Sequence, residues 1–167
     1  EKYGFEYFSS SATLNQVSDL LAAEGFQLHF HTVGDRAAGL ALNAIENLSN
    51  DTSGGMHRLT HCYLLDERDR ARFAQLGVVA DLQLAPSSLD SDYIDFLADD
   101  ILGDTRANQL LPAKEIFDSG ALVVMSSDWD ADVLSPLEKI ETILTRDDRP
   151  FDSVEQVIPF FTLNPAK

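Results

Sequence analysis

Short apolar runs alternate along this chain with segments of helical periodicity. The apolar runs span residues 26–31, 57–62, 78–85 and 121–128, and the helical patterns span residues 14–23, 36–48, 66–77, 112–120, 135–146 and 153–163. This alternation favours an α/β fold with a parallel sheet, because each helix carries the chain back to the start of the next strand. Residues 1–167 contain no linker or low-complexity tract and are predicted to form one domain. Two architectures fit, a doubly wound sheet and part of a TIM (β/α)₈ barrel.

The first apolar run carries two histidines on one face. In "FQLHFHTVGDRA", strand alternation predicts two opposite faces: Phe26, Leu28 and Phe30, and Gln27, His29 and His31. Gly25 is expected to end the helix before this strand, and Asp35 to cap the helix after it. His31 then closes the strand, at the end where α/β folds place their chemistry. The alternative is that both imidazoles simply have polar partners inside the fold.

Three polar residues close predicted strands at regular spacing. His31 and His61 are 30 positions apart, and His61 and Asp128 are 67 apart. A barrel of ~250 residues has a repeat of roughly 31 residues, so these gaps correspond to one repeat and to two repeats with a small insertion. All three side chains would converge at one end of a barrel. Two imidazoles and a carboxylate are ligands for zinc or a similar divalent ion, which activates a bound water.

Each of these residues also has a structural interpretation when it is taken singly. His31 could hydrogen-bond a neighbouring strand, His61 could be a half-buried strand histidine, and Asp128 could cap a turn. The joint spacing favours the metal site.

Composition excludes some classes of partner. The net charge of −16, from 12 basic and 28 acidic residues, argues against nucleic acid and against an anionic membrane. The single cysteine, Cys62, cannot form an internal disulfide, and no stretch is long and apolar enough to span a bilayer. Residues 86–109 form a connection too long to be without a role, and partly helical structure is expected there.

Several motifs together resemble a known enzyme family. "HFHTVGDRA", "HRLTHCYLLD", "LGDTRANQLLPAKEIFDSGALVVMSSDW", "SPLEKIETILTR" and "FTLNPA" resemble the amidohydrolase superfamily, and more narrowly amidohydrolase family 3, which includes N-substituted formamide deformylases. The resemblance runs from about Gly25 to Ala166. It implies a metal-dependent (β/α)₈ barrel with an added β-sandwich, of which this chain covers about strands 5 to 8. We therefore expect the chain to be part of a longer metal-dependent hydrolase.

The resemblance also implies roles for individual residues. His31 matches the metal-binding histidine that closes strand 5, and His61 matches the one that closes strand 6. Asp128 matches the strand 8 aspartate, which binds metal and takes a proton from the attacking water. The family's first metal-binding His-x-His, on strand 1, and its bridging carboxylate or modified lysine, on strand 4, lie outside this segment. The family usually has proline where this chain has Asp130.

Other residues are expected around that site. The "HFH" sequence looks like the family's strand 1 His-x-His motif, but only 136 residues follow it, which is too few for seven more βα units. His29 is therefore interpreted as lying behind the metal ligands or facing the substrate. Arg106 could hold a substrate carboxylate or be a surface arginine, and Trp129 could line the pocket or pack. Cys62 is expected to be a small buried residue, since no basic partner is adjacent in sequence.

These expectations lead to one favoured function and two alternatives. The favoured function is part of an amidohydrolase that cleaves a C–N bond in a small-molecule amide or cyclic amide, with one or two divalent metals, most simply zinc, in the full-length enzyme. The first alternative is a catalytically silent half-barrel scaffold, in which open barrel edges pair two copies into a homodimer. A doubly wound fold that binds a small anion is disfavoured, because no Gly-rich phosphate loop follows a strand.

Overall fold

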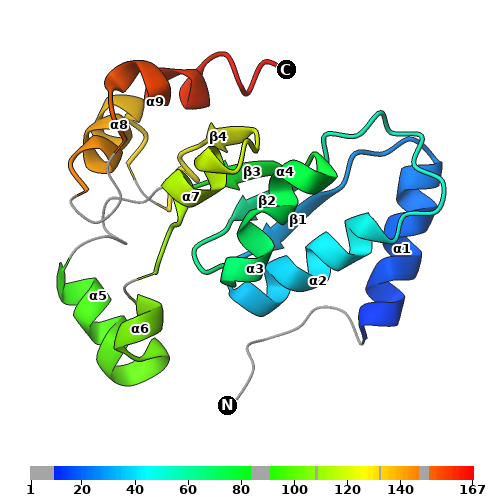
Figure 1. Cartoon of the computed structure of the whole chain (residues 1–167), viewed down its shortest axis with the longest axis horizontal. Helices are drawn as coiled ribbons and strands as arrows, with labels where there is room; N and C mark the ends of the chain where they lie inside the picture. Colours follow the sequence, from blue (N-terminus) through cyan, green and yellow to red (C-terminus); the bar gives the residue numbers. More distant parts are fainter. Residues whose placement is uncertain (1–9, 84–90, 108, 132, 147–150) are drawn as a thin grey trace.

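Four parallel strands form one sheet in a computed structural model that describes residues 10–83, 91–107, 109–131, 133–146 and 151–167 (Figure 1). The strands are β1 (His29–Thr32), β2 (Arg58–His61), β3 (Val79–Leu82) and β4 (Val123–Met125), and they neighbour one another in chain order. The helical segments are α1 (Ser11–Ala23), α2 (Asp35–Glu46), α3 (Glu67–Arg70), α4 (Arg72–Leu76), α5 (Ser91–Leu97), the π-helix η2 (Ala98–Leu102), α6 (Asp104–Ala107), α7 (Ala113–Asp118), α8 (Pro136–Leu144) and α9 (Val154–Phe161). The predicted α/β fold with a parallel sheet is confirmed.

Some local predictions were wrong. Phe26 lies outside β1 and its side chain is 60% exposed, so it does not join the apolar face of Leu28 and Phe30. Gly34, not Asp35, is the N-cap of α2, because Asp35 is already helical and its Oδ1 accepts the Arg36 N–H at 2.8 Å. The other carboxylate oxygen, Oδ2, is bound by Arg106 at 2.8 Å.

The helix predicted at residues 66–77 is also divided. It is interrupted at Ala71 into α3 and α4, and it ends as predicted at Gly77, whose φ is +65°. The predicted end of α1 is confirmed, since Gly25 follows the helix with a φ of +85°. Residues 84–85, predicted to end the third strand, lie outside the described residues.

The two faces of the sheet differ in chemistry. One face supplies the strand residues of the main hydrophobic core, which packs against helices α2, α4, α7, α8 and α9: Leu59, Ala80, Leu82, Val123 and Met125. The other face carries His29, His31, Thr60 and Asp81, as the predicted alternation requires for the two histidines. Asp81 is buried there and accepts hydrogen bonds from Arg58 Nη1 at 3.3 Å and Ser126 Oγ at 3.0 Å. We call this second surface the polar face.

A buried histidine joins the amino ends of β1 and β2. His57 Nδ1 accepts the Leu28 N–H at 3.0 Å, so the ring proton must be on Nε2. Nε2 lies 3.0 Å from Asp51 Oδ2 and therefore donates to that carboxylate. This His57–Asp51 contact fixes the loop of residues 49–55 to the start of the sheet.

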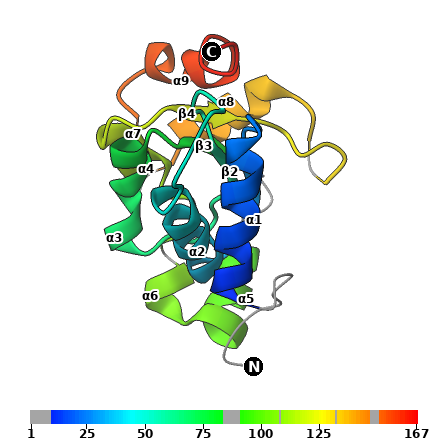
Figure 2. The same cartoon turned by 90° about the vertical axis from the view of Figure 1, so that its right-hand side faces the viewer.

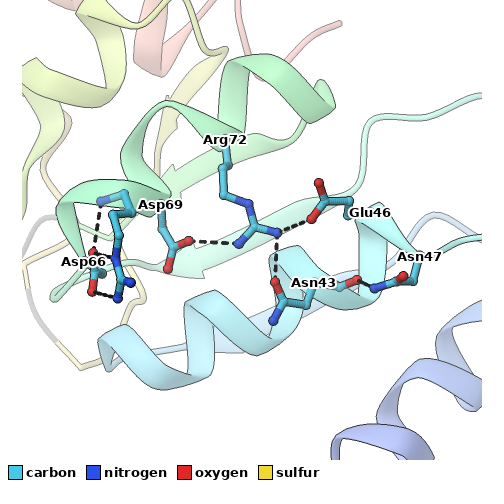
Figure 3. Close-up of polar contacts among 7 residues, drawn as sticks. Asn43, Glu46, Asn47, Asp66, Asp69 and Arg72 are labelled. Atoms are coloured by element: carbon cyan, nitrogen blue, oxygen red, sulfur yellow. Dashed lines mark hydrogen bonds and ion pairs between the residues drawn. The ribbon is translucent and has the colours of Figure 1, made fainter.

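An arginine fixes α2 against the α3–α4 pair (Figure 3). Arg72 Nη1 donates to Asp69 Oδ1 at 2.8 Å, and Nη2 donates to Asn43 Oδ1 at 2.9 Å and Glu46 Oε2 at 2.7 Å. The guanidinium thus contacts both helical segments through charge-assisted hydrogen bonds.

The segment between β3 and α7 shares a second, small core with the residues that follow β2. Leu64, Leu97, Ala107 and Leu110 pack together, and Ile94, Ala98 and Leu102 cover them. In Figure 2, α5 and α6 form a group at the opposite end of the molecule from α8 and α9. The predicted partly helical connection is confirmed, and we call residues 91–107 the helical insert. Within the described part of the chain, no helix is long and apolar enough to cross a bilayer.

Candidate functional site

The carboxyl ends of β1 and β2 bring two histidines into contact. His31 is exposed on the polar face, whereas His61, the last residue of β2, is only 7% exposed. Their ring centroids are 4.3 Å apart in an edge-on arrangement with an interplanar angle of 70°. The structure therefore pairs the first two predicted ligands, which are 30 residues apart in the sequence.

An unusual backbone directs His61 toward His31. His61 is in register with Thr32, whose hydroxyl is buried and donates to the Thr60 carbonyl. Regular alternation would turn the His61 side chain away from the polar face. Instead His61 and Cys62 have φ angles of +71° and +51°. This left-handed conformation costs roughly 1–2 kcal/mol per residue, and here it accompanies the contact between the two imidazoles.

Burial favours the neutral form of the His61 imidazole. Burial lowers the pKa of His61, and His31 lowers it further, while the carboxylates of Asp128 and Asp81 act in the opposite direction. A neutral imidazole keeps the lone pair that a metal ion requires. Among the described residues, His61 Nδ1 has no hydrogen-bond partner although it is buried, and the same holds for Thr60 Oγ1 and Gln83 Oε1. Buried polar atoms are rarely left unpaired, so the His61 nitrogen fits a site that takes a polar ligand.

The other predicted site residues are more scattered. Asp128 is exposed beyond β4, with a φ of +53°, and Trp129 beside it is 68% exposed. His29 is exposed on β1. Arg106, in the helical insert, forms an ion pair with Asp35 at 2.8 Å. Among the described residues, no group of three or more His, Cys, Asp or Glu side chains is placed to hold a metal ion. The structure thus joins His31 to His61 and does not bring Asp128 into a three-ligand cluster with them.

Tyr63 is a site residue that sequence reasoning missed. Its ring stacks on His61 with centroids 5.7 Å apart and an interplanar angle of 22°. Its hydroxyl donates to the Gln83 carbonyl at 3.1 Å, which connects the segments that follow β2 and β3. An aromatic residue two positions after a strand-closing histidine was the available signal. Asp81 was also missed, although an acid inside the apolar run "VVADLQLA" was a visible signal.

Cys62 is buried, as predicted. It is fully inaccessible, and burial raises the pKa of its thiol to about 12. Such a thiol is neutral at physiological pH and is unsuited to nucleophilic attack.

Solved structures share this fold. The chain superposes on an uncharacterized metal-dependent hydrolase from Pyrococcus furiosus with a TM-score of 0.76 and 20% identity, over 99% of this chain and 34% of that one. A second uncharacterized metal-dependent hydrolase, from Pyrococcus horikoshii OT3, gives a TM-score of 0.65 and 19% identity, over 94% of this chain and 30% of that one. At these identities the likeness establishes the fold alone.

Sequence comparison identifies the family. The Bacillus subtilis (strain 168) protein named "Putative amidohydrolase YtcJ" is 30% identical over 135 residues, 80% of this chain and 24% of that protein. The Arabidopsis thaliana "Protein LONG AFTER FAR-RED 3" is 27% identical over 124 residues, 73% of this chain and 21% of that protein. The chain thus spans less than a quarter of either relative. A family-3 model described as the amidohydrolase family matches residues 3–167, so the chain belongs to the amidohydrolase family.

Proposed function

We propose that this chain forms strands 5 to 8 of a (β/α)₈ barrel in a metal-dependent amidohydrolase that cleaves a C–N bond. Two features of the sheet support a barrel over a doubly wound fold. The strand order β1-β2-β3-β4 follows the chain without the reversal that defines a doubly wound sheet. The strand residues of the main core all come from one face, while the polar face would line a barrel interior.

The contact between His31 and His61 carries this proposal. Both imidazoles stand at carboxyl ends of adjacent strands, and burial lowers the pKa of His61. The buried Nδ1 of His61 has no hydrogen-bond partner among the residues that the structure describes. This donor set fits a divalent cation, and we propose zinc, held by His31, His61 and Asp128, with further ligands from outside the segment. When bound, the ion would supply Lewis-acid polarisation of the substrate carbonyl and would make the attacking water more acidic.

The chain's own residues would then move protons and orient the substrate. Asp128 would accept a proton from the attacking water and return it to the leaving nitrogen. His29 and Trp129 would border the substrate. Arg106 would bind a substrate carboxylate only by exchanging its present partner, Asp35, which it contacts at 2.8 Å. We propose a small-molecule amide, with a formamide as the first substrate to test, and neither nucleic acid nor membrane as a partner.

Metal content tests this function directly. The purified chain and its His61→Ala variant are compared by elemental analysis, with His29→Ala as a matched control on the same face. We expect stoichiometric metal in the wild type and in His29→Ala, and its loss in His61→Ala. Equal metal in all three proteins, or none in any, would contradict a site built on His61. Assays on formamides and N-acyl amino acids follow if metal is retained.

One observation favours a second candidate, a catalytically silent half-barrel that associates with itself. Within the described residues, β1 and β4 each have one unpaired edge, because neither pairs with the other. Edges of this kind invite pairing with another chain. A discrete dimer in light scattering, combined with no bound metal in elemental analysis, would favour this scaffold over the enzyme.

A further inference from the structure

We propose that Tyr63 is a positioning residue that fixes the His61 imidazole and connects it to the helical insert. Three contacts hold Tyr63 itself in place. Its ring stacks on His61, its hydroxyl donates to the Gln83 carbonyl, and its own carbonyl accepts the Leu111 N–H at 2.7 Å. Tyr63 is therefore held from both ends of the segment that joins β3 to α7.

His61 needs support of this kind. Its backbone is left-handed, and none of its ring atoms makes a hydrogen bond that would fix the orientation of the imidazole among the described residues. Metal-binding histidines are usually oriented by a hydrogen bond from the second ring nitrogen. Here the orienting contacts are the edge-on ring of His31 and the stacked ring of Tyr63. Of the two, Tyr63 is the more restrained, since His31 is exposed.

Tyr63 also joins two cores. It packs against the main hydrophobic core and against the small core of the helical insert, and among the described residues no other side chain belongs to both. The neighbouring Leu64 is part of the insert's core. A shift of the insert would therefore move Tyr63 and, through the stacked rings, His61.

The experiment is NMR spectroscopy of the full chain. The ring resonances of its four histidines can be assigned by substituting them one at a time. We expect a nuclear Overhauser contact between the rings of Tyr63 and His61 in the wild type. Tyr63→Leu removes the stacked ring and should move the His61 resonances, because its ring current is lost. Tyr63→Phe keeps the ring and should leave them near their wild-type positions. Phe117→Leu is the matched control, since Phe117 packs against the main core, where its ring contacts Phe151 in a tilted and Phe160 in an edge-on arrangement.

Zinc titration adds the second readout. The effect of Tyr63 on metal binding rests on the proposed function. Because Tyr63 orients the His61 imidazole, Tyr63→Leu should weaken zinc binding by about 10-fold, whereas Phe117→Leu should not weaken it. A wild-type chain that binds no zinc would refute the proposed function here, while the resonances would still decide the positioning role. The positioning role of Tyr63 would be overturned if the wild type lacks the Overhauser contact, or if the His61 resonances are unchanged in a folded Tyr63→Leu variant. The wild-type measurement holds even if Tyr63→Leu fails to fold.

Discussion

Cys62 sits between two strands with its sulfur 3.7 Å from Thr32 Oγ1 and 3.6 Å from the Leu59 carbonyl. Because its pKa is raised to about 12 by burial, the folded protein holds almost no thiolate at pH 8. We expect a thiol reagent such as Ellman's reagent to label the native chain only as fast as it unfolds. Labelling in strong denaturant is the control, and an equal rate for the native protein would show that Cys62 is accessible.

Sequence reasoning located the paired histidines but not the means of their pairing. Strand periodicity and the 30-residue spacing placed His31 and His61 on adjacent strands, and both positions are confirmed. The left-handed backbone at His61 left no trace in the sequence, because such a conformation in a non-glycine residue is imposed by tertiary packing. The assignment of His31, His61 and Asp128 as metal ligands stays a prediction.

The arginine side chains that form ion pairs on the helices differ greatly in solvent exposure. The side chain of Arg72 is 18% exposed and joins α2 to α3, whereas that of Arg68 is 87% exposed and pairs only locally with Asp66. Arg72→Met should lower the free energy of unfolding by about 1–3 kcal/mol, because it leaves Asp69 partly buried and unpaired. Arg68→Met should cost clearly less. Equal losses in urea unfolding of the two variants would contradict a role for Arg72 between the helices.

The loop that ends at His57 should give the chain an acid-sensitive element. Hydrogen bonds from Ser53, with a smaller contribution from His57, lower the pKa of Asp51 below its ordinary value of 3.8. A lowered pKa stabilises the fold above the unfolded-state value, and this stability is lost as the pH falls through the folded-state value. Asp51→Asn should therefore be less stable than the wild type at neutral pH, and the difference should shrink below pH 3.8.

Urea unfolding across that range checks the Asp51 prediction. Asp99→Asn removes the same charge from an exposed position and serves as the control. A gap between wild type and Asp51→Asn that stays constant with pH would show that the carboxylate contributes nothing through its charge.

Elements were predicted best where the signal is local. The start of the helix predicted at residues 135–146 is confirmed, because capping depends on neighbouring residues: Ser135 is the N-cap of α8, and its Oγ accepts the Glu138 N–H. The break at Ala71 was missed, since Ala is a good helix former. The flanking Arg70 and Arg72 donate tertiary hydrogen bonds to Glu115 and Glu46, which the sequence does not reveal. The small core of the helical insert was also missed, because its members come from segments far apart in sequence.

On the scale of the whole molecule, charge should oppose any association between copies. Each chain carries a net charge of −16, and several apolar side chains on two helices are exposed: Val17, Leu20 and Leu21 of α1 and Leu137 of α8. Salt shortens the Debye length from about 30 Å at 0.01 M to about 8 Å at 0.15 M, so screening should strengthen apolar and edge contacts between copies. Sedimentation equilibrium at these two salt concentrations tests this. Association that weakens with salt would point to ionic contacts instead.

The fold class was predictable because the alternation of strands and helices is a global pattern. Within the described residues β1 and β4 each pair along one edge only, so the four strands form an open sheet and do not themselves close a barrel. The partial barrel therefore stays a prediction, supported by strand order and by the separation of the two faces.

The left-handed backbone at the strand ends has an evolutionary consequence. Asp128 is exposed with a φ of +53°, so its strain is not repaid by burial of its side chain. Asp128→Gly should raise the free energy of unfolding by up to about 1 kcal/mol, because glycine adopts this conformation without a steric cost. Thermal unfolding checks this, and a less stable variant would show that Asp128 has a structural role. A lineage selected for durability alone would drift toward glycine here. Under the proposed function, Asp128 serves the chemistry of the site at a cost in stability.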